Sequence, residues 1–161
     1  MQNIETKKAM LRLGKLLVSK YKERMITDKT YATGKLHDSF KYKISSESEN
    51  IIRLDVLAAK YAKQIDQGRK PGQRAPGISP LIEWMKAKNI VPYTGSKAKD
   101  YKQAAIFIAA SIKENGTIAR FQNSGTNFIK EVAKQYQTEG VIDILESYRR
   151  DVENAINETI K

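Results

Sequence analysis

Apolar residues recur every three or four positions near the start of the chain. Over residues 4–25 they form one stripe: Met10, Leu13, Leu17, Tyr21 and Met25. An α-helix turns once in about 3.6 residues, so apolar side chains at this spacing share one of its faces. We therefore predict an amphipathic helix over this range. Leu11, Leu16 and Val18 widen its apolar surface, which leaves room for more than one packing neighbour.

A period of two replaces the helical period in the next part of the chain. Thr33 to Leu36 carries a turn signal, and two runs of alternating apolar and polar residues follow, over 40–45 and 51–57. Alternation places successive side chains on opposite faces of a strand, and the polar stretch between the runs predicts an antiparallel hairpin. The inner face of this hairpin holds aromatic and branched residues, namely Phe40, Tyr42, Ile44, Ile52, Leu54 and Val56.

Helical spacing returns in the middle of the chain. A short helix ends at Gly68, a residue that suits the left-handed position after a helix. A second helix opens with Ser79 as its N-cap and Pro80 in its first turn. A third covers residues 101–112 and ends at Gly116, and the small residues on its buried face imply close packing against another helix.

A long amphipathic helix is predicted over residues 139–160, with an apolar stripe formed by Val141, Leu145, Tyr148, Val152, Ile156 and Ile160. Residues 117–121 fit a short third strand. Together the elements predict a single domain of the α+β class over residues 1–161. In it, a small antiparallel sheet packs with the long N- and C-terminal helices and with two middle helices.

Residues 67–79 form a long loop that is rich in proline and glycine. Loops of this length in compact domains are usually functional or disordered, and proline stiffens the path of this one. Basic residues lie in the loop and just before it, and we expect them to contact DNA or a protein partner. They are Lys60, Lys63, Arg69, Lys70 and Arg74.

Basic residues outnumber acidic ones by 29 to 18, which gives the 161-residue chain a formal net charge of +11. Residues 1–125 hold +13 and residues 126–161 hold −2, a polarity that suits a polyanion on one side and a protein partner on the other. The absence of cysteine excludes disulfides, thiolate metal sites and thiol nucleophiles. No apolar run could span a bilayer, and the first ten residues lack the apolar core of a signal peptide. We therefore expect a protein that is not exported.

Residues that could support catalysis are sparse. His37 is the only histidine, and no nucleophile accompanies it. Asp55 and Lys60 are the residue types that hold a divalent ion and a phosphate in metal nucleases, but their spacing is loose, so we interpret them as a cross-strand partner and a solvated lysine. Trp84 is interpreted as a core residue rather than a binding anchor. We expect no catalytic residue, no cofactor and no metal.

Four elements follow one another in a characteristic order. They are Thr33-Gly34-Lys35-Leu36-His37-Asp38-Ser39-Phe40, Tyr61-Ala62-Lys63-Gln64-Ile65-Asp66-Gln67-Gly68-Arg69, a Pro-rich entry and Trp-containing helix over residues 76–90, and an Ala-rich helix ending in Gly-Thr over residues 104–117. Together they resemble the tail-completion proteins of tailed bacteriophages, also called head–tail joining or neck proteins. The resemblance covers about half of the chain, and the positions that carry it are Thr33, Gly34, Leu36, Tyr61, Gly68, Trp84, Gly116 and Thr117.

The resemblance implies a structural virion protein that is not an enzyme. Its subunits would form a ring, a head–tail connector that joins the portal or an adaptor to the tail proteins and lines or surrounds the DNA channel. It would contact packaged DNA in passing and without sequence specificity, contact neither membrane nor small-molecule substrate, and assemble in the host cytoplasm. Two alternatives remain: a sequence-independent DNA-binding protein, which rests on the same positive charge and loop, and a metal nuclease.

Overall fold

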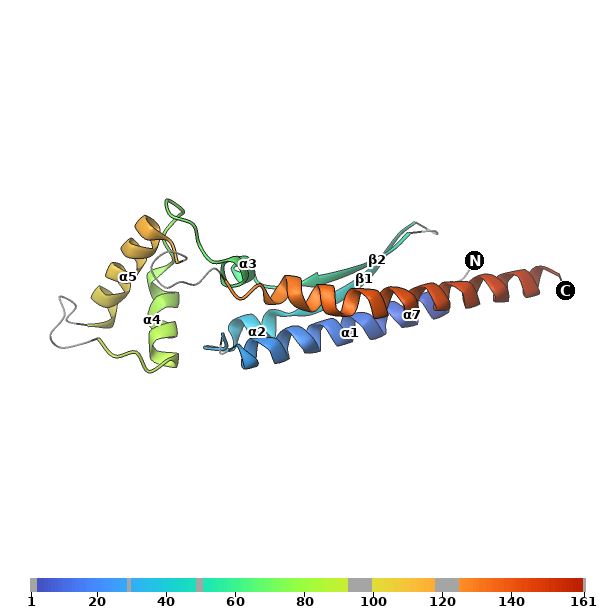
Figure 1. The fold of residues 1–161 in the computed structure, drawn as a ribbon, viewed down its shortest axis with the longest axis horizontal. Helices are drawn as coiled ribbons and strands as arrows, with labels where there is room; N and C mark the ends of the chain where they lie inside the picture. The colour runs from blue at the N-terminus through green and yellow to red at the C-terminus, as the bar shows by residue number, and fades with distance from the viewer. Residues whose placement is uncertain (1–2, 29, 49–50, 93–99, 118–124, 161) are drawn as a thin grey trace. The chain divides into compact units, whose positions relative to one another are not determined.

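The computed structural model describes residues 3–28, 30–48, 51–92, 100–117 and 125–160. These residues form six helices and one two-stranded sheet (Figure 1). The elements are α1 (Ile4–Thr27), α2 (Lys35–Ser39), β1 (Lys41–Ser48), β2 (Ile51–Leu57), α3 (Ala62–Gln67), α4 (Ile78–Ala87), α5 (Tyr101–Asn115) and α7 (Phe128–Thr159). The prediction of an α+β fold with a small antiparallel sheet and long N- and C-terminal helices is confirmed.

The chain folds into two compact units, each assembled from separate stretches of sequence. The long-helix unit comprises Met1–Met25, His37–Ala59 and Phe128–Lys161, and it contains nearly all of α1, the hairpin and α7. The basic unit comprises Ile26–Leu36 and Lys60–Asn127, and it contains α3, α4 and α5. The one-domain expectation stays a prediction.

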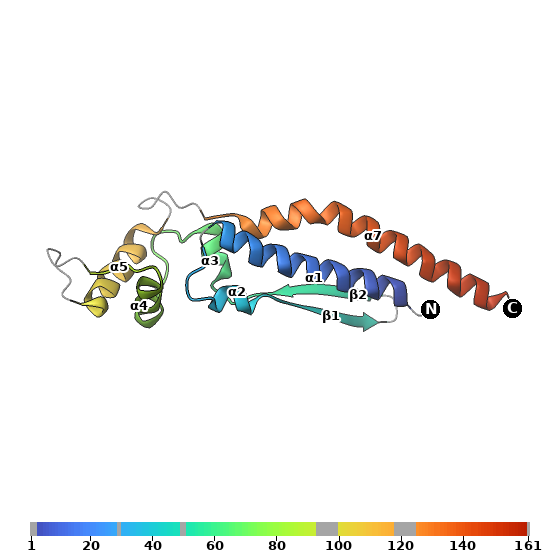
Figure 2. The same cartoon turned by 90° about the horizontal axis from the view of Figure 1, so that it is seen from below.

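Within the long-helix unit, α1 lies between α7 and the hairpin (Figure 2). Gly14 of α1 faces the hairpin, because a Cβ atom at this position would lie 2.8 Å from the Tyr42 ring and 3.0 Å from Leu54. Gly140 of α7 faces α1, where a Cβ atom would lie 2.5 Å from a methyl group of Leu13. These distances are shorter than van der Waals contact, so the missing side chains allow the three layers to approach closely.

The hairpin pairs β1 with β2 in antiparallel register, with Tyr42 opposite Val56 and Ile44 opposite Leu54. Directly paired residues share one face of a sheet, so the predicted inner face is confirmed for these four residues. The second strand keeps its predicted bounds, whereas the first begins one residue later and runs further than predicted. Phe40 therefore lies outside the strand.

Phe40 belongs instead to an aromatic cluster that joins the parts of the long-helix unit. Its ring stacks on Tyr21 of α1 at 5.3 Å between centroids and meets Phe128 of α7 edge-on at 6.0 Å. All three rings are buried. The N–H of Phe40 donates to the carbonyl of His37, which ends the short helix α2 before β1 starts. The turn predicted before the hairpin thus contains a helix that periodicity alone does not reveal.

Helix α7 starts at Phe128, well before the predicted start at residue 139. The prediction was wrong because residues 130–139 lack the apolar stripe that marks the rest of the helix. Their lysine, glutamate and glutamine residues are nevertheless good helix formers, and Phe128 and Val132 supply buried contacts. Of the predicted third strand, Thr117 lies in a turn and the remaining residues lie outside the described ranges.

In the basic unit, α4 and α5 pack on each other around Met85, Ala104 and Ala105. The alanines on α5 leave little volume between the helix axes, in agreement with the predicted close packing. Asp100 caps α5 by accepting a hydrogen bond from the N–H of Gln103 at 2.8 Å.

The start of α4 differs from the prediction. Its N-cap is Gly77, so Ser79 and Pro80 both lie within the first turn. Proline is tolerated there because the N–H groups of a first turn have no partner inside the helix. In the part of the chain that the structure describes, no helix combines the length and apolar character needed to cross a bilayer.

Candidate interaction surfaces

The basic loop covers residues 68–77 rather than the predicted 67–79, because Gln67 still belongs to α3 and α4 already begins at Ile78. Its backbone is fastened to the end of α5. The N–H of Thr117 donates to the carbonyl of Arg69 at 2.9 Å, and the N–H of Arg69 donates to Thr117 Oγ1 at 2.8 Å. A third bond joins the N–H of Gly72 to the carbonyl of Lys113 at 2.7 Å. We call this arrangement the loop clasp. It joins two of the four sequence elements through Arg69 and Thr117, which are 48 residues apart in the sequence.

Glycine is required at the centre of the loop clasp. Gly116 has φ +66, a left-handed conformation that side chains disfavour, and a Cβ atom there would collide with the backbone of Arg69 and Lys70. Gly68 ends α3 as predicted; it is the C-cap, with φ 70 and ψ 178, a conformation that favours glycine but is not the left-handed helical one predicted. Both glycines belong to the sequence elements that carry the resemblance, and the structure accounts for each by its backbone geometry.

The basic side chains near the loop differ in exposure. The guanidinium of Arg69 is half-buried and donates to the carbonyl of Arg74 at 2.6 Å, so it helps to shape the loop. The other four, Lys60, Lys63, Lys70 and Arg74, are exposed. A rigid backbone with exposed cations is a suitable surface for phosphate groups or for an acidic protein partner.

Charge divides unequally between the two units. The basic unit holds 14 basic and 5 acidic residues, a net charge of +9, whereas the long-helix unit holds 15 and 13, a net charge of +2. The basic loop therefore belongs to the unit that carries most of the positive charge of the chain. This division differs from the one between residues 1–125 and 126–161 found in the sequence, because the basic residues of 1–25 belong to the long-helix unit.

The remaining motif positions fall into two groups. Gly34 is buried with φ 78 and precedes α2, where Leu36 is also buried, so both have packing roles, whereas Thr33 is exposed. Tyr61 is exposed and starts α3; partial burial raises the pKa of its hydroxyl, and Lys35 opposes the shift.

The interpretation of Trp84 as a core residue is wrong. It is 38% exposed, because α4 turns Met85 rather than Trp84 toward α5.

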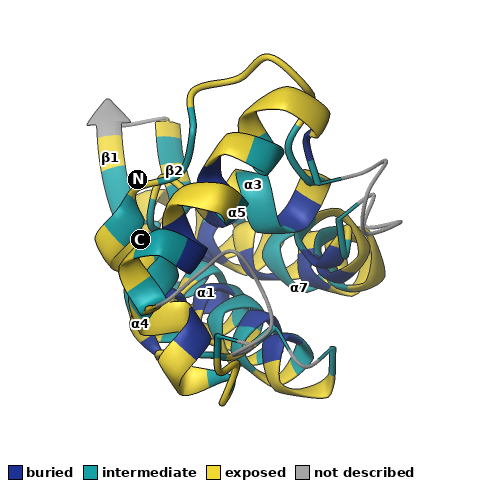
Figure 3. Ribbon diagram, turned by 90° about the vertical axis from the view of Figure 1, so that its left-hand side faces the viewer, coloured by how far each residue is buried: buried dark blue, intermediate teal, exposed yellow. Residues whose placement is uncertain are grey.

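Helix α7 buries its polar face and leaves its apolar face uncovered. Buried, intermediate and exposed positions all occur on this helix (Figure 3). The buried ones in its middle are Gly140, Ser147 and Asp151. The predicted apolar stripe lies on the opposite side at about 100° per residue, with Leu145 61% exposed and Ile160 78% exposed. We call the exposed residues Val141, Ile142, Leu145, Tyr148 and Ile156, with the half-buried Val152, the α7 stripe.

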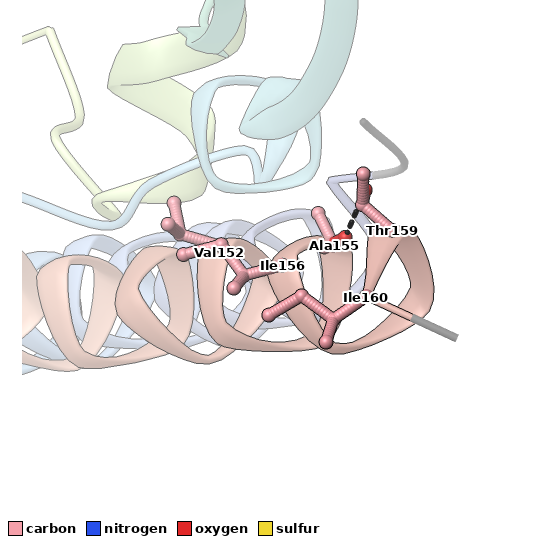
Figure 4. A pocket seen from close by; sticks show the side chains of 5 residues that line it. All are labelled: Val152, Ala155, Ile156, Thr159 and Ile160. Carbon is pink, nitrogen blue, oxygen red and sulfur yellow. Dashed lines mark hydrogen bonds between the residues drawn. The ribbon is translucent and has the colours of Figure 1, made fainter.

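The end of the α7 stripe forms a shallow apolar hollow. Figure 4 shows Val152, Ala155, Ile156 and Ile160 along one side of the helix, with the Thr159 hydroxyl turned back to donate to the carbonyl of Ala155 at 2.8 Å. All of its lining comes from α7 and from Ile160, the residue directly after the helix. An open hollow of this kind can receive an apolar side chain of another helix but cannot enclose a small molecule.

The polar face of α7 is held by a buried carboxylate. Asp151 accepts hydrogen bonds from the N–H of Glu5 at 3.0 Å, the N–H of Thr6 at 2.8 Å and the Thr6 hydroxyl at 2.7 Å. It thereby caps the start of α1, where backbone N–H groups lack partners within the helix. Burial alone would raise the pKa of Asp151, but these hydrogen bonds outweigh it and hold the pKa below its usual value.

Two surface ion pairs continue the contact between α1 and α7. Arg12 meets Asp143 at 2.8 Å, and Arg24 meets Glu131 at 2.9 Å. With Asp151 at the opposite end, these pairs show that α1 and α7 run antiparallel. Periodicity does not identify any of them, because each joins residues far apart in the sequence.

The residues weighed for catalysis are placed as ordinary surface groups. His37 lies 2.8 Å from its neighbour Asp38, and Asp55 stands directly across the hairpin from Lys43 rather than near another carboxylate. Among the described residues, no group of three or more histidine, aspartate or glutamate side chains could hold a metal ion. The features with a shape suited to function are therefore the basic loop and the α7 stripe.

Comparison of the chain with protein-family models, with curated proteins and with solved structures found no match in any of the three.

Proposed function

We propose that the chain is a structural virion protein of a tailed bacteriophage, a ring-forming head–tail connector subunit that joins the portal to the tail. The observation that carries the proposal is the separation of two surfaces. The long-helix unit bears the uncovered α7 stripe, and the basic unit bears a net charge of +9 and a fastened basic loop. A connector needs both kinds of surface, one to bind protein subunits and one to tolerate or contact passing DNA.

The sequence elements that resemble tail-completion proteins support the same proposal. Gly68 and Arg69 close one element, Gly116 and Thr117 close another, and the loop clasp joins the two. These residues have structural roles in or next to the loop clasp. A resemblance to tail-completion proteins at such residues is a better sign of a common fold than a resemblance in composition. In this role the protein acts through its surfaces and needs no catalytic group, cofactor or metal.

A second candidate, a sequence-independent DNA-binding protein, is favoured by the charge of the basic unit. Phosphate attraction does not depend on base sequence, so a net charge of +9 suffices for salt-sensitive affinity. This candidate leaves the α7 stripe without a use. Under the connector proposal the stripe is covered in the assembled ring.

Purified virus particles provide the test. We expect the protein to be present in intact virions at a fixed number of copies, and cryo-electron microscopy to place it between portal and tail. Removal of its gene should yield filled heads and unattached tails, because the joint between them is missing. If the protein is absent from virions and found only in the infected cell, the connector proposal fails and the DNA-binding candidate replaces it.

The basic loop can be tested separately. The double variant Lys70→Ala with Arg74→Ala removes two exposed charges and keeps the Arg69 bond to the backbone of residue 74. We expect it to fold normally and to reduce particle assembly. The control is Lys102→Ala with Lys130→Ala, which removes the same charge from exposed helix positions. Equal assembly by both variants would show that the loop only connects α3 to α4.

A further inference from the structure

The edge of the α7 stripe carries an acidic row. Glu139, Glu146 and Glu153 recur every seven residues, which is close to two helical turns, and all three are exposed. Glu153 pairs with Arg149 on the same helix at 2.8 Å. Among the described residues, no basic side chain pairs with the carboxylate of Glu139 or Glu146; Arg150 reaches only the backbone carbonyl of Glu146, at 3.4 Å. An apolar stripe with acidic residues along its edge is a surface that fits an apolar and basic helix.

Helix α1 presents such a surface on its outer side. Lys8, Lys15 and Lys22 also recur every seven residues, and the described residues provide no acidic partner for Lys15 or Lys22. Beside this row lie Ile4, one turn before Lys8, and Leu11, between Lys8 and Lys15; they are 49% and 41% exposed and are again seven residues apart. This outer face points away from α7 and the hairpin of the same chain, because Gly14 and Leu13 on other sides of α1 make those contacts.

The two surfaces match in length and in charge. Each charged row spans fourteen residues, or about 21 Å along a helix. The remaining described helices are too short for the α7 stripe, since α5 has 15 residues and α4 has 10. Residues 1–25 contain seven basic and two acidic side chains, whereas residues 126–161 contain five and seven. Two α7 helices packed antiparallel would bring their acidic rows together.

From this complementarity we propose that the α7 stripe of one subunit packs against the outer face of α1 of a second copy of the same chain. The contact is head-to-tail, because it joins two different surfaces, and it repeats from subunit to subunit until a ring closes. Burial of the apolar residues supplies the affinity, and the lysine and glutamate rows select the partner and its register. This contact rests on the proposed ring and gives that ring its subunit interface.

Charge reversal provides the test, because Lys15, Glu139 and Glu146 are exposed and Lys22 is half-buried in the folded chain. Variant A carries Glu139→Lys with Glu146→Lys, and variant B carries Lys15→Glu with Lys22→Glu. Sedimentation velocity over a concentration series at low ionic strength measures self-association. We expect the wild-type chain to self-associate and each variant to do so roughly tenfold or more weakly, with unchanged circular dichroism.

Restoration distinguishes a head-to-tail contact from other contacts. A chain that carries all four substitutions presents a basic α7 and an acidic α1, so it should associate like the wild type. An equal mixture of A and B should do the same, with alternating subunits. The proposal is overturned if the wild-type chain stays monomeric at every concentration, if A and B associate normally, or if the fourfold variant is folded but remains as weak as A.

The apolar part of the contact needs its own variant and control. Leu145→Asp places a charge in the middle of the α7 stripe, whereas Phe107→Asp places the same charge on the outer side of α5, where the native residue is 52% exposed. We expect the first to abolish self-association and the second to leave it unchanged. Equal effects of the two substitutions would contradict the assignment of the contact to α7.

Cysteine chemistry identifies the partner helix directly, since the chain contains no cysteine. Leu11→Cys and Leu145→Cys chains are mixed and oxidised, with Ser79→Cys as a control on α4. Cross-linking between positions 11 and 145 is expected, and a dominant product between two copies of position 145 would refute the proposal. The virion experiment is independent of this one. If the protein forms this contact but is absent from virus particles, the connector function is disproved and the contact between copies stands.

Discussion

Replacement of Asp151 tests whether the contact between α7 and the start of α1 determines the stability of the long-helix unit. The carboxylate is buried and accepts three hydrogen bonds, from Glu5 N, Thr6 N and Thr6 Oγ1. Asp151→Ala leaves these donors without partners in a site that water cannot reach easily. A lost cap costs about 0.5–2 kcal/mol and an unsatisfied buried donor about 1–3 kcal/mol. Because the buried charge and its desolvation cost also disappear, we expect a net loss of about 2–4 kcal/mol.

Asp151→Asn separates shape from charge. The amide keeps the volume and one acceptor oxygen, but its NH₂ group faces an N–H donor, so we expect a loss of about 1–2 kcal/mol. Urea unfolding followed by circular dichroism gives both values. Asp143→Asn is the matched control: its carboxylate pairs with Arg12 at the surface and should cost less than about 1 kcal/mol. If Asp151→Ala is no less stable than this control, the capping role is refuted.

The same carboxylate predicts a dependence on pH. Its pKa in the folded state lies below the ordinary value of 3.8, so the folded state favours the ionised form. The resulting stabilisation is fully present above the unfolded pKa and is lost as the pH falls through the folded pKa. Wild-type stability should therefore decline below about pH 4 more steeply than that of Asp151→Asn. Parallel declines of the two proteins would show that other carboxylates cause the acid sensitivity.

Three further substitutions test the packing. Ser147→Ala removes a buried hydroxyl that has no hydrogen-bond partner among the described residues, so urea unfolding should find stability unchanged or raised by about 1 kcal/mol. Gly140→Leu forces a side chain against Leu13 and should cost about 1–3 kcal/mol in the same assay. Gly116→Ala combines a left-handed φ with a collision against Arg69, so thermal unfolding should detect a loss above about 2 kcal/mol and protease should cut the basic loop faster.

Local patterns predicted most elements of the fold, and non-local contacts account for what they missed. The period of apolar residues located α1 and α5, and alternation located the hairpin with its inner face. The first turns of α7 and the whole of α2 were not predicted from the sequence. Their packing depends on Phe128 and Phe40, which meet only after the chain has folded. A helix of polar residues anchored by one buried aromatic has no periodic signal.

The candidate surfaces were predicted in part. Exposed cations in the basic loop follow from the sequence, but the loop clasp does not, because it pairs Arg69 with Thr117 across 48 residues. For α7, the apolar stripe was predicted from the sequence, but the side of the helix that packs within the subunit was not. A second signal was available: Gly140, Ser147 and Asp151 fall on one face at helical spacing, which is the pattern of a close helix contact with a polar bond.

Because α7 buries its polar face and exposes its apolar stripe, the proposed contact with a second copy requires a fixed register between α7 and α1. Burial of Asp151 is favourable only in one register, where three donors of α1 surround the carboxylate, and any slip leaves the buried charge without these donors. That single register aligns the exposed acidic row of α7 relative to the basic row of α1 within each subunit. A head-to-tail contact needs this alignment, because successive subunits repeat the same rotation only when both surfaces are held rigidly on one body. Under the head-to-tail contact that we propose, Asp151 would connect the stability of one subunit to the geometry with which the next one binds.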